Sequence, residues 1–570
     1  RRAYSGWHQR IKLIESHANG DSQFILEGEF FHPDTTMLKR ILSTLFVLSF
    51  LSACVLAMPD PGPTSTEEST PVQLARENWW RDAVFYEIFV RSYYDTNNDG
   101  IGDFNGVTQK LDYLQSLGIN AIWLMPIHPS PSYHGYDVIN YYAVNPDYGT
   151  MDDFKNLLAE AHKRDIRIII DLVLNHTSSQ HPWFKSANSD SNSPYRDYYV
   201  WSEESKRSGW YQGHQGYYFG LFWSGMPDLN YKNPSVTTDM LKVTDFWLNK
   251  IGVDGFRVDA AKHLIEDGDK RENTPATHDW YKGFYTAYKA QNPLAYTVGE
   301  VFGAGSSIIK SYTGDQLDQI FNFEMSSGFV NSSNGGANSG INSAVKFSLQ
   351  DVPDFNFATF LTNHDQTRAM SVFYGNVNKA KLASFLMLTS PGTPFIYYGE
   401  EIGMQGQKPD EDLRLPMQWS SDEYAGFSMT NPWRAPAKDY QQVNVALQSG
   451  DSNSLLEHYR SLIALRNSHA SLRTGEVFLL ETNNPGSYAA LRVDQSETIL
   501  VLVNLTGEAI TDYALVLEDA GLAESAYSAE TLFGAGQAHA PERSGESFPE
   551  YKPFEKLDPY AMYVIKINPK

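Results

Sequence analysis

The chain has 570 residues, which exceeds a single ordinary domain, so we expect two or three domains. Its 68 acidic and 45 basic residues give a net charge of −23, which argues against a nucleic-acid partner because phosphates would be repelled. The sequence contains one cysteine, Cys54, and a single thiol excludes an intrachain disulfide.

Residues 37–54 have the layout of a secretory signal peptide. Met37 is followed by two basic residues, an apolar run and small residues that lead to Cys54. The run is too short and too asymmetrically flanked for a membrane span. Its last residues, LSAC, resemble a bacterial lipobox, in which the cysteine is lipidated and becomes the mature N-terminus. We therefore expect Cys54 to anchor the protein outside the cytoplasm, at the cell surface or facing the periplasm; a buried structural cysteine is the alternative.

The other N-terminal segments predict no packed fold. Residues 1–36 would precede the true start of the protein, as a non-native leader, and we assign them no structure. Residues 55–78 predict a flexible tether, because the stretch at 59–71 is rich in Pro, Ser, Thr and Glu and is too polar to pack.

From Trp79 onward, strand-like and helix-like segments alternate. Helical patterns such as 151–164 and 237–251 lie between apolar, β-branched or aromatic runs, several of them continuous enough to be buried on both faces. Eight such units predict a closed (β/α)8 TIM barrel over residues 79–176 and 235–465, with a doubly wound open sheet as the alternative. The predicted strands are 84–90, 121–127, 167–174, 255–260, 295–301, 317–323, 357–363 and 394–400.

Two further regions complete the predicted organisation. Residues 177–234, after the third predicted strand, are rich in Ser, Asn, Gly, Tyr and Trp, and we expect an inserted irregular domain. Residues 466–570 contain short apolar runs separated by Gly/Asn turns, which predicts a C-terminal antiparallel β-sandwich domain.

Several predicted strands end in charged or amide side chains. Because the carboxyl ends of parallel strands meet at one mouth of a barrel, where such enzymes place their chemistry, we expect one acidic site there. The segments are DLVLNH (171–176), GFRVDAAKH (255–263), VGEVF (298–302) and FLTNHDQ (360–366), and they supply Asp259, Glu300 and Asp365.

These segments closely resemble, in order, those of glycoside hydrolase family 13, the α-amylase family. The resemblance runs from Trp79 to the C-terminus and includes GINAIWLMPI (118–127), MPDLN (226–230) and GTPFIYYGEEIGM (392–404). Within the family, the chain resembles bacterial lipoprotein α-amylases that lie between the oligo-1,6-glucosidase and neopullulanase groups. The resemblance implies a hydrolase that cleaves α-glucosidic bonds with retention, through two carboxyl groups about 5–5.5 Å apart.

The resemblance also implies the role of each site residue. Asp259 would be the nucleophile, and Arg257, two residues earlier on the same strand face, would keep it ionised. Glu300 would be the acid/base, its pKa raised by burial and neighbouring acids. Asp365 would bind sugar hydroxyls and favour the distorted ring of the transition state. Of the remaining residues, His176 and His364 would donate to hydroxyls of the same glucose, Tyr136 would stack on that glucose, and Asp171 would be a structural partner of Arg257.

The segment DTNNDGIGD (95–103), after the first predicted strand, is spaced like the first ligands of a calcium loop. Gly106 stands where an EF-hand has its bidentate Glu, so an EF-hand does not fit. The resembling family carries a calcium loop here, which implies structural Ca²⁺, with a merely polar loop as the alternative. The ligands would be Asp95, Asn97, Asp99, the Ile101 carbonyl and Asp103; Asn175, Asp228 and His263 match a second calcium site described for many α-amylases.

The motifs that separate family members conflict. In oligo-glucosidases, residues matching Asp137 and Arg414 close the far end of the glucose pocket, whereas α-amylases have a Lys-His pair, here Lys262 and His263, that contacts sugars on the leaving side. We expect an endo-acting α-amylase of starch and malto-oligosaccharides, without an obligate protein partner. An exo-acting α-glucosidase or oligo-1,6-glucosidase and a neopullulanase-like enzyme are the alternatives, and a non-catalytic glycan-binding lipoprotein is a remote one.

Overall fold

The computed structural model describes residues 77–206, 208–352, 354–517, 522, 526–543 and 550–570. The chain separates into two units, Arg1–Gln73 and Leu74–Lys570. The predicted signal peptide, Cys54 and nearly all of the predicted tether lie outside the described residues.

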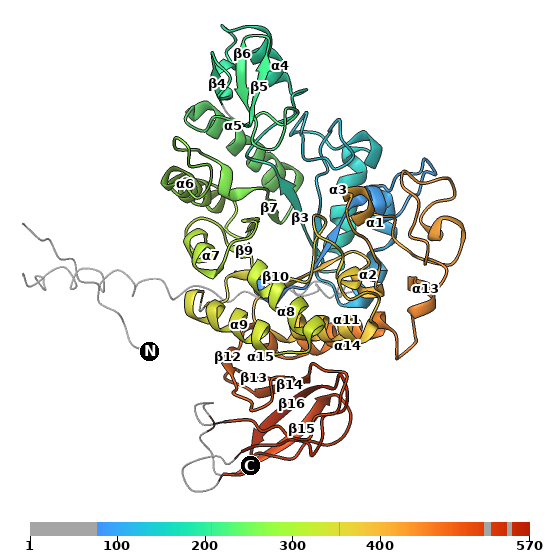
Figure 1. Ribbon diagram of the computed structural model, residues 1–570. Helices are drawn as coiled ribbons and strands as arrows, with labels where there is room; N and C mark the ends of the chain where they lie inside the picture. Colours follow the sequence, from blue (N-terminus) through green and yellow to red (C-terminus); the bar gives the residue numbers. More distant parts are fainter. Residues whose placement is uncertain (1–76, 207, 353, 518–521, 523–525, 544–549) are drawn as a thin grey trace, which may run out of the picture. The chain divides into compact units, whose positions relative to one another are not determined.

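The second unit contains a closed barrel of eight parallel strands, in the order β1-β11-β10-β9-β8-β7-β3-β2 (Figure 1). The barrel closes where β1 pairs with both β2 and β11, which excludes the open sheet and confirms the predicted fold class. Each predicted strand contributes one barrel strand: β1 (Phe85–Ile88), β2 (Ala121–Leu124), β3 (Arg167–Leu172), β7 (Gly255–Val258), β8 (Tyr296–Gly299), β9 (Gln319–Phe321), β10 (Phe357–Phe360) and β11 (Thr393–Tyr397).

Aromatic side chains fill the barrel interior. Phe85 and Phe395, from adjacent strands, stack with ring centroids 4.2 Å apart, and Phe321 packs edge-on against Phe395 at 4.9 Å. Trp123 and Tyr296 belong to the same buried cluster. The barrel is therefore a packed core rather than a pore, and only the loops at its ends can form a site.

Helices follow most of the strands and surround the barrel. Helix α3 begins where the sequence predicts, because Thr150 and Asp153 form a reciprocal capping box at its N-terminus. The helices are α1 (Phe104–Gln109), α2 (Leu111–Leu117), α3 (Met151–His162), α5 (Pro234–Asp245), α6 (Pro275–Gln291), α7 (Ser306–Tyr312), α8 (Phe323–Gly335), α9 (Ser339–Asp351), α10 (Ala369–Val372), α11 (Val377–Thr389), α12 (Asp410–Leu413), α13 (Val445–Gln448), α14 (Leu455–Ser468) and α15 (Ala470–Thr474). No helix in the described part of the chain is both long and apolar enough to span a membrane.

The segment between β3 and α5 forms a small structure of its own. It contains helix α4 (Pro182–Ser189) and a three-stranded antiparallel sheet of order β4-β6-β5. The strands are β4 (Trp201–Ser202), β5 (Trp210–Gly213) and β6 (Gly216–Phe219). This insertion leaves the barrel at the carboxyl end of β3, so it stands beside the mouth where a site is expected.

The C-terminal region contains one five-stranded antiparallel sheet of order β12-β13-β14-β16-β15. A sandwich would have a second sheet packed on this one. In the described residues of this region, the further strand pairings are isolated bridges, such as Thr482 to Leu515 and Ile510 to Leu557. These segments are short and irregular, which limits their pairing to single bridges. The strands are β12 (Glu476–Leu479), β13 (Ser487–Val493), β14 (Thr498–Asn504), β15 (Tyr527–Phe533) and β16 (Met562–Pro569).

One face of this C-terminal sheet shares the hydrophobic core of the barrel domain. Along β14, Ile499, Val501 and Val503 belong to the same buried cluster as the barrel helices, whereas Leu500 and Leu502 belong to a separate outer cluster. Alternate residues of a strand point to opposite faces, so β14 is buried on both sides.

Two buried glutamates follow β11. Glu401 accepts hydrogen bonds from the Tyr86 and Tyr113 hydroxyls over 2.8 and 2.7 Å, and Glu400 accepts one from Tyr459 of α14 over 2.8 Å. Burial raises the pKa of Glu400 to about 8, so this carboxyl is largely protonated at neutral pH.

Candidate active site

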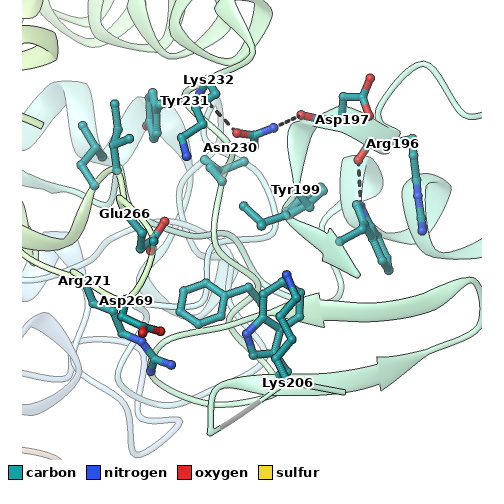
Figure 2. A pocket seen from close by; sticks show the side chains of 18 residues that line it. Arg196, Asp197, Tyr199, Lys206, Asn230, Tyr231, Lys232, Glu266, Asp269 and Arg271 are labelled. Carbon is teal, nitrogen blue, oxygen red and sulfur yellow. Dashed lines mark hydrogen bonds between the residues drawn. The ribbon is translucent and has the colours of Figure 1, made fainter. Parts of the chain in front are cut away.

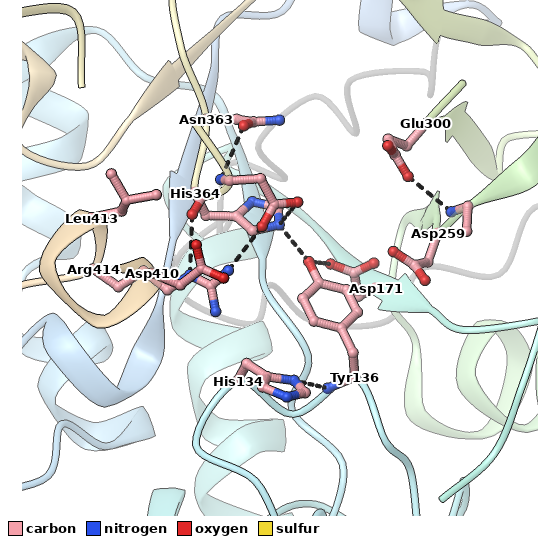
Figure 3. Close-up of polar contacts among 12 residues, drawn as sticks. His134, Tyr136, Asp171, Asp259, Glu300, Asn363, His364, Asp410, Leu413 and Arg414 are labelled. Atoms are coloured by element: carbon pink, nitrogen blue, oxygen red, sulfur yellow. Dashed lines mark hydrogen bonds and ion pairs between the residues drawn. The ribbon is translucent and has the colours of Figure 1, made fainter. Parts of the chain in front are cut away.

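A cavity of about 540 Å³ opens at the carboxyl ends of the barrel strands (Figure 3). Residues in the segments that follow β3, β7, β8 and β10 contribute to its wall, as expected for a parallel barrel. It is lined by His134, Tyr136, His176, Phe222, Trp223, Met226, Asp259, Ala260, Lys262, His263, Glu300, Phe302, Asp365, Lys408, Asp410 and Arg414. The three strand-end carboxylates predicted from the sequence are therefore brought together in one cavity.

Arg257 of β7 lies beneath this cavity and contacts three carboxylates. Its Nη1 donates to Asp259 over 2.6 Å and to Asp171 over 2.7 Å, and its Nη2 lies 3.4 Å from Glu300. The guanidinium is 1% exposed, so these interactions are only weakly screened by water. The buried positive charge of Arg257 therefore favours the ionised forms of Asp171, Asp259 and Glu300.

Glu300 and the residue after Asp259 are joined directly. The backbone N–H of Ala260 donates to Glu300 Oε2 over 2.9 Å, and Ala260 has a left-handed backbone conformation with φ 47°. A non-glycine residue in that region is strained, and such strain is found where the surrounding structure requires one geometry. Here the strained turn aims an N–H at the second carboxyl group.

Burial raises the pKa of both carboxyl groups that flank this turn. For Asp259 the rise is opposed by Arg257, through charge and a hydrogen bond. For Glu300 burial is again opposed by Arg257, and the negative charge of Asp259 adds to the rise. Arg257 approaches Asp259 at 2.6 Å and Glu300 at only 3.4 Å, so the opposing effect is stronger at Asp259. Arg257 therefore favours the ionised form more strongly at Asp259 than at Glu300.

Asp365 lies across the cavity, between two cations. Arg414 Nη2 donates to Asp365 Oδ1 over 2.8 Å, and His364 Nε2 lies 3.4 Å from Asp365 Oδ2. Burial acts against ionisation, but the charges of His364 and Arg414 outweigh it and lower the pKa of Asp365 to about 2. Asp365 is therefore an ionised hydrogen-bond acceptor throughout the neutral range.

The floor of the cavity is a buried network around Tyr136. Its hydroxyl lies 2.7 Å from His364 Nε2, and the two rings are stacked with centroids 5.7 Å apart. His364 Nδ1 in turn lies 2.5 Å from Glu87 Oε1. Burial lowers the pKa of His364, but the charges of Asp365 and Glu87 outweigh this and raise it.

Asp171 is held from a second side as well. Trp123 Nε1 donates to Asp171 over 3.1 Å, which supports Asp171 as a structural partner of Arg257.

His176 presents an unused polar atom to the cavity. Its Nε2 is buried and has no hydrogen-bond partner among the described residues, and burial lowers the pKa of His176 to about 4. The Phe222 ring lies edge-on to the imidazole, with centroids 5.3 Å apart. A neutral imidazole nitrogen without a partner fits the predicted contact with a ligand hydroxyl.

Lys262 and His263 line the cavity but are already engaged. Lys262 Nζ contacts Glu272 at 2.8 Å and donates to the Phe302 carbonyl over 3.0 Å. His263 Nδ1 lies 2.9 Å from the Arg271 carbonyl. An ammonium has three protons, so one N–H of Lys262 remains for a ligand.

Three large aromatic side chains stand half-exposed at the mouth, and we call them the aromatic wall. Phe222 and Trp223 are each 48% exposed and Phe302 is 53% exposed. Phe302 packs on Phe323 with centroids 5.0 Å apart, which fixes its orientation. None of the three was predicted from the sequence as a site residue. The one available signal was Phe302, two residues after a strand-end glutamate.

Asp137 was predicted to help close the pocket, but the structure places it elsewhere. Within the described residues, the cavity lining does not include Asp137, which accepts hydrogen bonds from the hydroxyls of Ser130 and Ser132. Both serine hydroxyls donate to Asp137 Oδ1. His134, Lys408 and Asp410 line the cavity and were not predicted from the sequence.

The loop at 95–103 satisfies its own acidic side chains. Asp95 accepts hydrogen bonds from the backbone of Asn97, Asn98 and Gly100, and Asp103 accepts from Gly106 and caps helix α1. In the part of the chain that is described, no group of three or more His, Cys, Asp or Glu side chains is placed to hold a metal ion. The loop thus contains carboxylate oxygens that could bind a cation, but backbone N–H groups of the same loop already donate hydrogen bonds to them.

Asn175 and Asp228, matched above to a second calcium site, have unused oxygens. Asn175 Oδ1 and Asp228 Oδ2 are buried, and no residue that the structure describes forms a hydrogen bond with either atom. Burial raises the pKa of Asp228 far above its usual range. Unpaired buried oxygens are costly, and a cation with oxygen preference fits both atoms chemically.

Comparison with known proteins places this cavity in a family context. Residues 87–475 match the family described as Alpha amylase, catalytic domain. The chain is 44% identical over 438 residues to alpha-amylase 3 of Dictyoglomus thermophilum, covering 75% of this chain and 86% of that protein. It is 33% identical over 517 residues to the oligo-1,6-glucosidase of Parageobacillus thermoglucosidasius, covering 75% and 90%. The crystal structure of the alpha-amylase from H. orenii superposes with a TM-score of 0.74 at 37% identity, covering 85% of this chain and 99% of that chain.

Proposed function

Because the chain belongs to glycoside hydrolase family 13, the α-amylase family, we propose that it is an endo-acting α-amylase. Its substrates would be starch and malto-oligosaccharides, cleaved at internal α-1,4-glucosidic bonds. The observation that carries the proposal is the aromatic wall, Phe222, Trp223 and Phe302. Half-exposed aromatic faces at the mouth of an acidic cavity suit the apolar C–H faces of sugar rings that extend beyond the cleaved bond.

The proposed first chemical step uses the two carboxyl groups that share Arg257. The ionised Asp259 attacks the anomeric carbon while Glu300 gives its proton to the leaving oxygen, so that the C–O bond breaks and a glycosyl ester forms on Asp259. The short contact between Arg257 and Asp259 supports this division, since it favours the charged form of the nucleophile.

The proposed second step reverses the proton transfer. Glu300, now ionised, takes a proton from water, and the water oxygen attacks the anomeric carbon and releases Asp259. Asp365, held ionised by Arg414 and His364, would accept hydrogen bonds from two sugar hydroxyls of the distorted ring. Tyr136 would provide the stacking face beneath that ring.

Exo attack is a second candidate, because one specific feature favours it. Arg414, Lys408 and Asp410 form a charged wall on the Asp365 side of the cavity, and Lys408 and Asp410 form an ion pair. Such a wall can bind the end of a chain and exclude longer ones, as an α-glucosidase or oligo-1,6-glucosidase requires. Neopullulanase-like cleavage of pullulan is compatible with the same residues.

A product time course separates these candidates. Soluble starch, maltotriose and pullulan are each incubated with the full chain, and iodine colour, reducing ends and free glucose are followed together. The endo proposal expects the iodine colour to collapse while few reducing ends have appeared. Glucose from the first minutes with persistent colour would establish the exo alternative, and no reducing ends at all would indicate a non-catalytic glycan-binding protein.

Calcium remains a proposal for two places. At 95–103, Asp95, Asn97, Asp99, the Ile101 carbonyl and Asp103 would supply hard oxygen ligands, with the fold already set by hydrogen bonds. At the second place, Asn175 and Asp228 would each give an oxygen that otherwise has no partner. In both places calcium would stabilise the fold and take no part in bond cleavage.

We also propose that Cys54 carries a lipid that anchors the enzyme outside the cytoplasm of a bacterium. The support is the signal-like segment 37–54 and the absence of a second cysteine from the sequence. Cys54→Ser should abolish incorporation of labelled fatty acid and release the protein from the membrane fraction. Unchanged labelling in that variant would exclude Cys54 as the attachment site.

A further inference from the structure

We propose that a second cavity, separate from the active site, binds a neutral saccharide chain. The cavity lies between the inserted sheet and the segment 264–271 and has a volume of about 750 Å³ (Figure 2). This volume is within the range of roughly 300–1,000 Å³ for small-molecule sites. Among the described residues, it shares no lining residue with the cavity that holds Asp259 and Glu300.

The charges around this cavity favour a neutral, hydroxylated ligand. A simple anion would meet carboxylates and a simple cation would meet basic groups, since both signs line the walls almost equally. Sugar hydroxyls can donate to the carboxylates and accept from the cations at the same time. The basic groups are Arg196, Lys206, Lys232 and Arg271, and the acidic groups are Asp197, Glu266 and Asp269.

Glu266 supplies a hydrogen-bond acceptor without a partner in the described part of the chain. Its Oε1 is buried, and none of the described residues donates to it. Burial raises the pKa of Glu266, and the charges of Lys232 and Arg271 oppose that rise. Figure 2 shows Glu266 between these two basic side chains, on the side of the cavity opposite Arg196 and Asp197. Buried acceptors are normally paired, so a donor from a ligand or from solvent belongs at this atom.

Trp210 of β5 provides the apolar surface that a sugar ring needs. Trp201, the other tryptophan of this cavity, has the Arg196 guanidinium 3.4 Å from its ring centroid and stacks on Phe184 at 5.9 Å. Lys206 Nζ lies 4.7 Å from the Trp210 ring centroid, where the ammonium can also donate to a sugar hydroxyl at the ring edge. Trp210 is partly buried and packs tilted against Phe219 with centroids 5.4 Å apart. Trp210 and Glu266 therefore offer the two contacts that saccharide recognition combines: stacking and a hydroxyl acceptor.

The same short segment separates the two cavities and belongs to both. Lys262 and His263 line the active site, whereas Glu266 and Arg271 line the second cavity. The segment is closed on itself, because the Arg271 carbonyl lies 2.9 Å from His263 Nδ1. A chain bound in the second cavity would therefore lie beside the active site, which is useful for an enzyme whose substrate is a polymer. The choice of α-glucan as the ligand rests on the proposed function.

Binding without turnover tests the inference. Asp259→Asn, which should be unable to form the glycosyl ester, is titrated calorimetrically with maltotetraose, in calcium and again after chelation. Two binding events are expected, and adding Trp210→Ala or Glu266→Gln should weaken one of them at least tenfold and leave the other unchanged. Glu204→Gln, an exposed glutamate of the inserted domain, is the matched control and should change neither.

The outcomes that would overturn the inference are specific. A single event in Asp259→Asn that neither substitution alters would exclude a second saccharide site. An effect of Glu266→Gln that disappears after chelation would identify the cavity as a cation site. Circular dichroism checks that each variant is folded. If Trp210→Ala is misfolded, the test rests on Glu266→Gln, which keeps the side-chain volume.

A separate measurement distinguishes failure of the inference from failure of the proposed function. In the active enzyme, Trp210→Ala should raise KM for soluble starch severalfold while kcat/KM for maltotriose stays unchanged. Absence of any starch hydrolysis by the wild type would refute the proposed function alone. Titration of isomaltose and trehalose into the same protein would then test whether the second cavity binds a saccharide. If neither sugar bound, the inferred saccharide site would be refuted.

Discussion

Arg414 donates to Asp365 over 2.8 Å and also binds the His364 carbonyl over 3.1 Å. The contact joins the segment after β11 to the end of β10, across the mouth of the cavity. Asp137, which the family resemblance implied would close the pocket together with Arg414, accepts from Ser130 and Ser132. Arg414 therefore acts on the site through the carboxylate that would grip the sugar.

Arg414→Ala should consequently impair catalysis rather than only shorten the pocket. Without this cation the pKa of Asp365 should rise and the carboxylate should lose its fixed position. We expect kcat/KM on soluble starch to fall about 10- to 100-fold, or about 1.4–2.8 kcal/mol. Arg434→Ala is the matched control, because Arg434 pairs with Asp412 at 2.5 Å within the same region but does not line the cavity. Equal losses in both variants would argue against a specific effect on Asp365.

Asp259→Asn should abolish turnover and leave the fold intact. Loss of a nucleophile removes several kcal/mol of transition-state stabilisation, so we expect at least a 1,000-fold fall in kcat, about 4 kcal/mol. Glu300→Gln should retain more activity on an aryl maltoside than on starch, because a good leaving group needs less protonation. The roles would have to be reassigned if Asp259→Asn kept more than about a hundredth of wild-type activity, about 2.7 kcal/mol.

Glu400 should make the folded state less stable as the solution becomes alkaline. Its pKa is about 8 in the fold, above its ordinary value of 4.5, so the folded state binds more protons between these two pH values. The stabilisation is complete below about pH 4.5 and is lost as pH rises through 8. Between pH 6 and 8 the free energy of unfolding should fall by about 2 kcal/mol from this group. Glu400→Gln, which mimics the protonated form, should flatten the urea-unfolding profile over that interval, whereas Glu457→Gln should not.

Chelation should lower the melting temperature if calcium occupies the loop at 95–103. Calcium bound only by the folded state stabilises it in proportion to the logarithm of free ligand over Kd, so added Ca²⁺ should restore melting gradually. Asp99→Ala should abolish the response, because it removes a proposed ligand. Identical melting of the wild type with and without chelator, together with no metal by elemental analysis, would remove this site.

Lys262→Ala should affect long substrates more than short ones. One N–H of Lys262 is free of Glu272 and Phe302, and a lost hydrogen bond costs about 0.5–1.5 kcal/mol, or roughly 2- to 12-fold in kcat/KM. The measurement compares soluble starch with maltotriose in wild type and variant. Glu272→Gln is the companion variant, since it frees the lysine without removing it. Equal losses on both substrates would place Lys262 outside the leaving-group side.

Local sequence patterns were sufficient to predict the barrel and its acidic centre. The barrel strands lie in runs rich in apolar, β-branched or aromatic residues. Asp259, Glu300 and Asp365 follow such runs, so their convergence needs only the rule that parallel strands share a mouth. By contrast, β15 (Tyr527–Phe533) gives a weak strand signal, because its residues are mostly only partly buried and show no clear alternation.

The loops that complete the site could not be predicted in the same way. Lys408 and Asp410 reach the cavity from a long segment after β11, and the sequence contains no periodic signal for their direction. The bond between Lys262 and Glu272 depends on how the segment between them folds back. The second cavity is still harder to predict from the sequence, because Trp210 and Glu266 line it together only when the insertion packs against the barrel.

The two-sided burial of β14 has a consequence for how this chain could have diversified. Val501 packs with the barrel helices and Leu502 with the outer cluster, so the two faces of β14 must fit different neighbours. A substitution that suits one neighbour leaves the other unchanged, but an exchange of the entire sheet must match both at once. The C-terminal region is therefore poorly suited to recombination as a separate cassette, and we expect it to have been inherited together with its barrel.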